Sequence, residues 1–212
     1  MEGQERILSY ATEQFLKLGV RNVTMDDLAQ QLGISKKTIY QVYQTKADLV
    51  DAVAEAYFKN EETQSDLITQ NANNAIDELS KIVIWTISTF RRVSPNLIHE
   101  IQKFYPDAWR RFESFSNNFI LSKMKQNLAQ GIAEGLYRSN LDVEIMARLR
   151  VMQIGGSLQS QYFPSEQFDQ AKIQYEIFEF FLRGIVSDAG REVLNTHLSH
   201  SSMTHSEPNT QS

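Results

Sequence analysis

Apolar residues recur at α-helical spacing along almost the whole chain, and this periodicity constrains the fold more than any other feature of the sequence. The first stretch illustrates it, because Ile7, Ala11 and Phe15 follow one another at intervals of four and so share one helix face. No segment alternates apolar and polar residues as a β-strand does, and no internal repeat is visible. The sequence therefore predicts an all-α protein of about nine helices.

Turn and capping signals divide this pattern into segments. The four prolines lie where breaks are expected: Pro95, Pro106, Pro164 and Pro208. The expected helices cover residues 4–18, 25–32, 35–43, 45–69, 73–92, 95–104, 107–134, 142–161 and 166–188. We expect these helices to form two domains, over residues 1–50 and 51–190.

The C-terminal residues have a different composition. From Asn195 onward they are rich in Ser, Thr, His and Asn, so we expect a disordered tail over residues 191–212. Three tail histidines could in principle bind a metal, but no carboxylate-rich frame holds them and a solvated tail is favoured. These histidines are His197, His200 and His205.

Composition excludes several classes of site and location. The 212 residues contain no cysteine, which excludes disulfides and thiolate metal sites, and we expect neither a metal nor a cofactor. The N-terminus lacks a basic segment followed by an apolar core, so no secretory signal is expected. The apolar run over residues 82–85 is far too short to cross a bilayer. We therefore expect a cytoplasmic protein without a membrane partner.

The first 50 residues have the pattern of a helix-turn-helix. Thr24 begins a capping box with an acid three residues later, which opens a short second helix. Gly33 can adopt a positive φ at the turn, and Ala29 is small where two helices would cross closely. Ile34 and Ile39 would hold the third helix against the first two. Three short helices joined in this way are typical of DNA-binding heads.

The charge distribution gives a second indication of an anionic partner. The net charge is −5, yet residues 33–47 contain three lysines and no acid. Lys36 and Lys37 lie in the first turn of the third helix, where the helix dipole disfavours a cation by ~0.3–1 kcal/mol. A polyanion docked there would explain them, whereas the alternative is that both lysines are simply solvated.

The stretch from Ile7 to Asp51 resembles the DNA-binding domain of TetR/AcrR-type transcriptional regulators. It reads ILSYATEQFLKLGVRNVTMDDLAQQLGISKKTIYQVYQTKADLVD and covers about a quarter of the chain. Matching positions at fixed spacing are Phe15, Gly19, Thr24, Leu32, Gly33, Ile34, Ser35, Thr38, Ile39, Tyr40, Tyr43 and Lys46. Tyr43 stands where the family more often has Phe.

The resemblance implies a role for individual residues of the head. Tyr40, Lys46 and the Thr24 end of the second helix match positions that contact phosphates, although Tyr40 could instead belong to the core. The exposed surface of the third helix matches the part that faces base edges, and lysine and glutamine suit guanine and adenine respectively. The full set of expected DNA-binding residues is Thr24, Ser35, Lys36, Lys37, Thr38, Tyr40, Gln41 and Lys46.

Aromatic residues are dense in the middle of the larger domain, between two proline breaks. Such residues at helical spacing usually form a core, but a short interrupted helix among them favours an apolar ligand pocket. The residues expected to line the pocket are Trp85, His99, Gln102, Phe104, Tyr105, Trp109 and Phe112. No pair of side chains here resembles a catalytic dyad, so we expect no catalytic residues and no enzyme activity.

The last two long helices are expected to form a homodimer interface. Gly155 and Gly156 cost about 1 kcal/mol each relative to Ala within a helix, and close approach of a partner helix would explain them. The last helix is apolar over too wide a surface for one buried stripe, and Ile177 and Phe181 are the expected contacts. The alternative is a helix buried centrally within one chain.

Together these features predict a homodimeric repressor that binds a pseudo-palindromic double-stranded DNA operator. A small apolar or amphipathic ligand in the larger domain would release it, which requires that the ligand bind the two states with different affinity. The alternative is an architectural or ligand-independent DNA-binding protein, which would show weak sequence selectivity.

Overall fold

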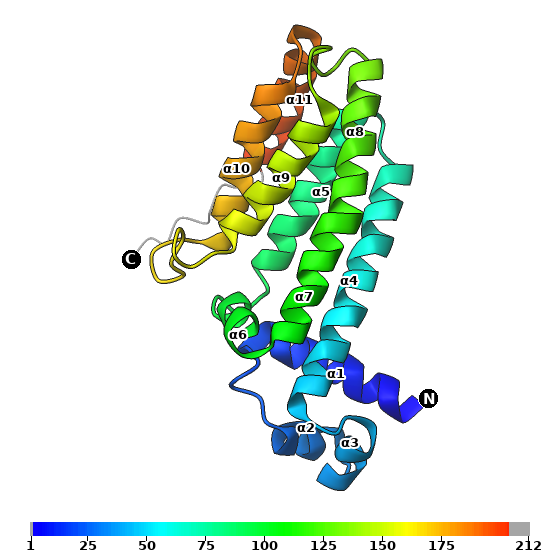
Figure 1. The fold of residues 1–212 in the computed structure, drawn as a ribbon, viewed down its shortest axis with the longest axis vertical. Helices are drawn as coiled ribbons and strands as arrows, with labels where there is room; N and C mark the ends of the chain where they lie inside the picture. Colours follow the sequence, from blue (N-terminus) through cyan, green and yellow to red (C-terminus); the bar gives the residue numbers. More distant parts are fainter. Residues whose placement is uncertain (1, 204–212) are drawn as a thin grey trace.

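The computed structural model describes residues 2–203, with side chains for residues 3–196, and helices joined by loops make up this part of the chain (Figure 1). The elements are α1 Glu2–Leu18, α2 Met25–Leu32, α3 Lys36–Val42, α4 Lys46–Gln70, α5 Ala75–Phe90, α6 Leu97–Phe104, α7 Pro106–Phe115, a π-helical turn Ser116–Ile120, α8 Leu121–Ala133, α9 Val143–Ser157, α10 Gln170–Ile185 and α11 Asp188–Met203. Within the described residues the only β-type pairing is an isolated bridge between Tyr137 and Val186. The predicted all-α class is confirmed.

Local capping interactions fix the three short helices of the head. The Thr24 hydroxyl accepts a hydrogen bond from the Asp27 amide, and the Asp27 carboxylate accepts one from the Thr24 amide, which completes a capping box. Gly33 ends α2 with φ 65°, a left-handed conformation that a side chain would strain. Ser35 then caps α3 by accepting from the Thr38 amide. Gly33 and Ser35 thus fix the turn between α2 and α3.

Helix α4 runs without interruption from the head into the larger domain (Figure 1). Its first turns carry Leu49, Val50 and Val53, which are buried in the same core as α1 and α2. Farther along, Asp51 accepts two hydrogen bonds from the Arg111 guanidinium of α7, at 2.6 and 2.7 Å. The boundary expected between residues 50 and 51 thus falls inside a continuous helix.

A second core lies among α5, α8, α9, α10 and α11. The expectation of a disordered tail from residue 191 is wrong for residues 191–203, which belong to α11. The reason is Leu194, which is 1% exposed and packs in this second core. Residues 204–212 lie outside the described part of the chain, as do the side chains of the tail histidines His197, His200 and His205.

The single helix expected over residues 107–134 is divided by a π-helical turn at Ser116–Ile120. The chain continues from α7 through this turn into α8 without a break in direction (Figure 1). π-Turns inside α-helices widen the helix locally and occur often at functional sites. The turn brings the Phe115 and Phe119 rings into a stack with centroids 5.4 Å apart.

Gly131 is required by the second core and offers a test of its packing. A Cβ at this position would overlap the ring of Tyr137, which is 2% exposed and cannot move aside. Gly131→Ala should therefore lower the free energy of unfolding by about 1–3 kcal/mol, through overpacking. Thermal or urea unfolding measures this, with Gly3→Ala as the control because a Cβ there meets nothing. Equal stability of the two variants would contradict this packing.

Candidate DNA interface and internal cavity

The exposed face of α3 carries the polar residues expected to contact DNA. Ile39 is fully buried against the head, so the residues on the other faces of this two-turn helix point outward. Lys37 and Gln41 are exposed, and Tyr40 is 39% exposed, so its ring lies at the surface rather than in the core. Tyr43, expected in the core, is buried at 6% exposure.

The two lysines at the start of α3 differ in their surroundings. Lys36 forms an ion pair with Asp26 of α2 at 2.8 Å, and hydrogen bonding to that carboxylate raises the lysine pKa. Its ammonium also lies 5.9 Å from the centre of the Tyr40 ring. Lys37 has no ion pair within the described part of the chain. Lys37 is therefore the lysine most available to an external anion.

Three of the expected DNA contacts also have structural duties in the head. The Thr24 hydroxyl is hydrogen-bonded to Asp27, and the Ser35 and Thr38 hydroxyls lie 2.8 Å apart. All three remain exposed. Their hydroxyls hold the helix starts in place whether or not they touch a phosphate.

Lys46, at the start of α4, turns back onto the head. Its ammonium donates to the carbonyl oxygen of Val20 at 2.6 Å and lies 5.9 Å from the centre of the Phe15 ring. Burial lowers the pKa of this lysine, against the opposing effect of the charges on Glu100 and Asp27. A phosphate contact by Lys46 would have to share or replace the bond to Val20.

Helix α6 joins the head to the larger domain. The Ser94 amide donates to the Leu16 carbonyl at 2.7 Å, and the Arg21 amide donates to the buried Glu100 carboxylate at 3.0 Å. Leu97 belongs to the head core. The loop between α1 and α2 is thus bound directly to α6.

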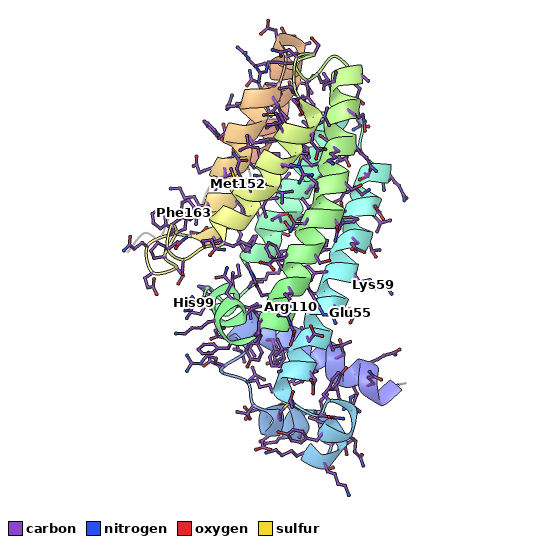
Figure 2. All side chains as sticks on the ribbon, in the orientation of Figure 1. Glu55, Lys59, His99, Arg110, Met152 and Phe163 are labelled. Carbon is purple, nitrogen blue, oxygen red and sulfur yellow. The ribbon has the colours of Figure 1, made fainter. Side chains whose placement is uncertain are left out.

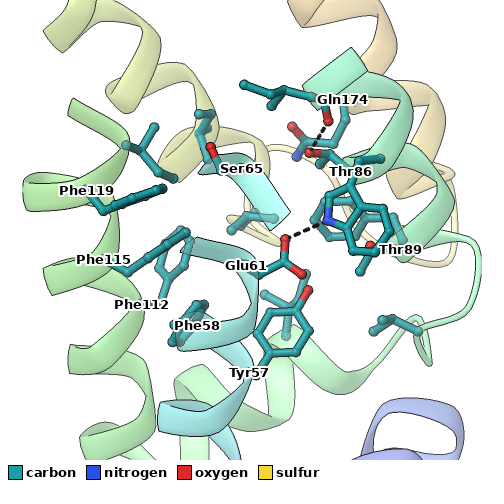
Figure 3. A pocket seen from close by; sticks show the side chains of 18 of the residues that line it. Tyr57, Phe58, Glu61, Ser65, Thr86, Thr89, Phe112, Phe115, Phe119 and Gln174 are labelled. Carbon is teal, nitrogen blue, oxygen red and sulfur yellow. Dashed lines mark hydrogen bonds between the residues drawn. The ribbon is translucent and has the colours of Figure 1, made fainter. Parts of the chain in front are cut away.

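A cavity of about 310 Å³ lies where the head meets the larger domain. Small-ligand sites in proteins are typically about 300–1,000 Å³, so this cavity is large enough for a small ligand. Its wall includes residues of α1, α4, α5, α6, α7, α8, α9 and α10. Aromatic rings cover one side, where Phe58 of α4 stacks on Phe115 with centroids 5.0 Å apart (Figure 3).

Polar groups interrupt the apolar wall at a few places. The Glu61 carboxylate accepts a hydrogen bond from the Trp85 indole at 3.0 Å (Figure 3), and burial raises the Glu61 pKa. Burial likewise raises the pKa of Tyr57 beside it. On α10, Gln174 is 2% exposed and donates to the Ser157 hydroxyl. These groups could orient a bound molecule.

The structure distributes the expected pocket residues over three places. Trp85, Trp109 and Phe112 lie on the cavity wall. His99 lines a separate, more polar hollow between the first residues of α6 and the loop before α10, and Figure 2 labels His99 and Phe163 from its two sides. Phe104, Tyr105 and Gln102 line neither hollow, because α6 turns Leu97, Ile98 and Ile101 toward the cavity instead.

The surroundings of Phe104, Tyr105 and Gln102 differ from those of the cavity residues. Phe104 is 45% exposed and its ring lies under the Arg21 guanidinium, 5.2 Å from it. Tyr105 packs against the head core. Gln102 is half-buried, and its amide nitrogen has no hydrogen-bond partner within the described residues.

The residues expected at the dimer interface differ in their exposure. A Cβ on Gly155 or Gly156 would meet nothing within 4 Å, so no contact inside the chain accounts for either glycine. Ile177 is half-buried, whereas Phe181 is 3% exposed and packs in the second core of its own chain. Phe181 is therefore covered by its own chain, whereas the neighbouring Phe180 is 76% exposed.

Several residues that line the cavity were not predicted from the sequence. Tyr57, Phe58 and Glu61 lie on α4, which by sequence belongs to the connection rather than the pocket. Arg150 and Gln174 line the cavity from α9 and α10, which were expected to serve the dimer. Helical spacing could have found Arg150, since it falls on the same face as the buried Ala147 and Ser157.

Comparison with known proteins agrees with the geometry of the head. Residues 7–53 match the family described as bacterial regulatory proteins, tetR family. The head therefore belongs to the TetR family of transcriptional regulators.

Relatives extend the similarity beyond the head. An uncharacterized HTH-type transcriptional regulator of Bacillus subtilis, YvaF, is 23% identical over 188 residues, covering 87% of this chain and 96% of that protein. The HTH-type transcriptional repressor KstR2 of Mycobacterium tuberculosis is 25% identical over 150 residues, covering 67% and 72%. A solved transcriptional regulator from Cytophaga hutchinsonii matches with a TM-score of 0.74 at 21% identity, covering 88% and 100%.

Two further observations bear on what the regulator can bind. Among residues 2–203, no helix combines the length and apolar content needed to cross a bilayer. The described side chains contain no cluster of three or more histidines or carboxylates that could hold a metal ion.

The contrasting surroundings of two lysines generate a prediction for the head. Lys37→Ala should weaken binding to every DNA sequence and reduce the slope of log affinity against log salt by about one, without changing stability. Lys46→Ala should also lower the free energy of unfolding, by about 0.5–1.5 kcal/mol, because it removes the bond to Val20. Fluorescence anisotropy at several salt concentrations and thermal unfolding measure the two effects.

Gln41→Ala is the matched variant for sequence readout. It should relax the preference at one base position while leaving binding to random DNA unchanged, because an amide reads a base edge and carries no charge. Operator affinity unchanged in both Lys37→Ala and Gln41→Ala would show that α3 does not enter the groove.

Proposed function

We propose that this regulator is a homodimeric repressor that leaves its operator when a small apolar or amphipathic molecule occupies the cavity. The observation that carries the proposal is that the cavity wall and the head core share residues. Phe15, Val20 and Val50 belong to the core of the head and also line the cavity. A molecule bound there would touch the DNA-binding head without an intermediary.

Two helices could convert occupancy into a movement of the head. Helix α4 lines the cavity with Val53 and Tyr57, and its first turn lies beside α3. Helix α6 lines the cavity with Ile101 and holds the α1–α2 loop through Glu100. Close-packed elements move as units, so a ligand that separates α4 from α6 would tilt the head.

Pairing of two chains would let two α3 helices enter successive major grooves of a pseudo-palindrome. Apolar side chains on α9 and α10 are exposed where a partner would sit, namely Ile145, Met152 and Phe180, and Met152 projects from α9 in Figure 2. The open positions of Gly155 and Gly156 would allow a partner helix to come close. A chromosomal operator as the target places the regulator in the cytoplasm.

Reciprocal linkage between ligand and operator tests the proposed release. Among small apolar and amphipathic molecules, one that alters the fluorescence of Trp85 and Trp109 should also release operator DNA over the same concentration range. By thermodynamic linkage, operator DNA must weaken binding of that molecule by the same factor. Trp109→Ala should lose the response while keeping operator affinity, since Trp109 lies on the cavity wall and not on the head.

Two results would contradict this scheme. A molecule that binds the cavity with equal affinity in the presence and absence of operator would show that the two sites are not coupled. Binding to DNA with little sequence selectivity would instead favour an architectural role.

The pairing of chains has its own test. Gly156→Leu and Phe180→Ser should each shift the protein toward monomer in sedimentation, the first through overpacking that costs about 1–3 kcal/mol per site and the second through loss of apolar contact. Operator affinity should fall in both, although neither residue is on the head. Leu67→Ser, at an exposed apolar position on α4, is the control and should stay dimeric. A wild-type protein that sediments as a monomer at micromolar concentration would exclude the interface.

A further inference from the structure

Arg150 is a buried cation without an anion. Arg150 is 6% exposed, and its side chain lines the cavity from α9. It makes no hydrogen bond or ion pair with any of the described residues, and its buried Nη1 atom has no partner. Burial lowers the pKa of this guanidinium to about 10, so it remains charged at neutral pH. Arginine side chains are rarely buried unless they are paired.

Aromatic rings compensate for only part of this charge. The Arg150 guanidinium lies 5.6 Å from the centre of the Phe178 ring and 5.7 Å from that of Phe181. Such contacts attract a cation through the ring face but accept none of its five N–H donors in the way an oxygen does. The free energy of removing an unpaired charge from water exceeds what two ring contacts return.

Among the side chains that the structure describes, no carboxylate is placed to fill the gap. The acids on the cavity wall are Glu61 and Glu78. Glu61 accepts from the Trp85 indole, and Glu78 accepts from Asn127 at 2.7 Å and from Thr69 at 2.6 Å. Arg150 is only 6% exposed in the single chain, so little of it is accessible to a second copy. A molecule that enters the cavity from solution could supply the missing anion.

The cavity separates this charge from a large apolar surface. Arg150 lies next to Phe178, and Gln174 lies one turn before Phe178 on the same side of α10. In Figure 3, Gln174 lies well away from Phe58, Phe112 and Phe115, which cover the opposite part of the wall. The other wall cation, Lys123, already pairs with Asp66 at 2.6 Å. One positive charge without an anionic partner therefore faces a space lined mainly by apolar side chains.

We propose that the cavity binds a lipophilic monocarboxylate, with the carboxylate on Arg150 and the hydrocarbon part against the aromatic wall. This inference rests on the proposed function and specifies the chemical class of its ligand. The planar guanidinium fits a carboxylate through two parallel hydrogen bonds, which also gives the ligand a fixed orientation. A single charge suffices, because Arg150 is the only wall cation of the described chain that lacks an anion.

Three dodecyl compounds of similar size test the assignment on the DNA-free protein. Dodecanoate, dodecanol and dodecyltrimethylammonium are titrated by isothermal calorimetry, with octanoate and octanol as a shorter pair. Wild-type protein should bind each carboxylate about 10- to 100-fold more tightly than its alcohol, as expected for a buried charge-assisted bond, and the cation most weakly. Equal affinity for carboxylate and alcohol, or binding of none of the compounds, would overturn the proposal.

Arg150→Met should remove the preference for the carboxylate and leave affinity for the alcohol within about threefold of wild type. Arg150→Lys, which keeps the charge but not the planar fork, should retain an intermediate preference. Arg110→Met is the matched control, because Arg110 lies on the outside of α7 with a side chain 64% exposed, and it should behave as wild type. A carboxylate preference that survives in Arg150→Met would overturn the assignment.

Thermal unfolding separates a ligand-binding arginine from a structural one. Without ligand, Arg150→Met should melt at or above the wild-type temperature, because it removes an unpaired buried charge. Dodecanoate should raise the melting temperature of wild type and not of the variant. A ligand-free variant that melts well below wild type would show that Arg150 supports the fold, and would overturn the proposal.

Operator release, measured separately, distinguishes this inference from the proposed function. If dodecanoate binds through Arg150 and leaves operator affinity unchanged, the ligand class stands and the repressor scheme fails. If uncharged molecules bind as tightly as carboxylates and release the operator, the scheme stands and the ligand class fails.

Discussion

The apolar contact among α1, α4 and α6 supports both the DNA-binding head and the cavity above it. Phe15, Val50 and Leu97 contribute to one core, so the head is held by two helices of the larger domain rather than by a flexible connection. Because protein interiors are close-packed, none of these three helices can shift without a response from the other two. The same packing that gives the head its stability thus also connects it to the cavity, and a separate hinge is unnecessary.

Features that depend on neighbours in sequence could be predicted well. The Thr24 capping box, the left-handed Gly33 and the buried Ile39 each involve residues within one or two turns, and the sequence placed all three. Features that depend on distant packing could not. Nothing local distinguishes Phe180 from Phe181, which differ by a rotation of about 100° around α10, and only the position of the second core decides which is buried. The order of α11 likewise depends on a pocket for Leu194 formed by other helices.

The candidate sites show the same division between local and distant information. Lys36 and Lys37 are unfavourable for the dipole of α3, and this is visible in the sequence. That Asp26 on α2 pairs with Lys36 and not with Lys37 is visible only in the structure. Aromatic density located one wall of the cavity, but it did not identify α4, which adds Phe58 to that wall, or α9 and α10, which contribute Arg150 and Gln174 elsewhere on the wall. Arg150 has the same composition signal as any surface arginine, and only its helical phase relative to Ala147 indicates burial.

The π-helical turn at Ser116–Ile120 affects how the shape of the cavity can change in evolution. A π-turn accommodates one extra residue while the helices on either side keep their registers. Loss of one residue from this turn would restore ordinary helical geometry locally, yet α7 would still face α4 and α8 would still face α9. The rings of Phe115 and Phe119 would rotate relative to each other, so the shape of the aromatic wall would change while the head and the second core stayed intact. Deletion of a single codon here could thus change the ligand preference without changing the fold.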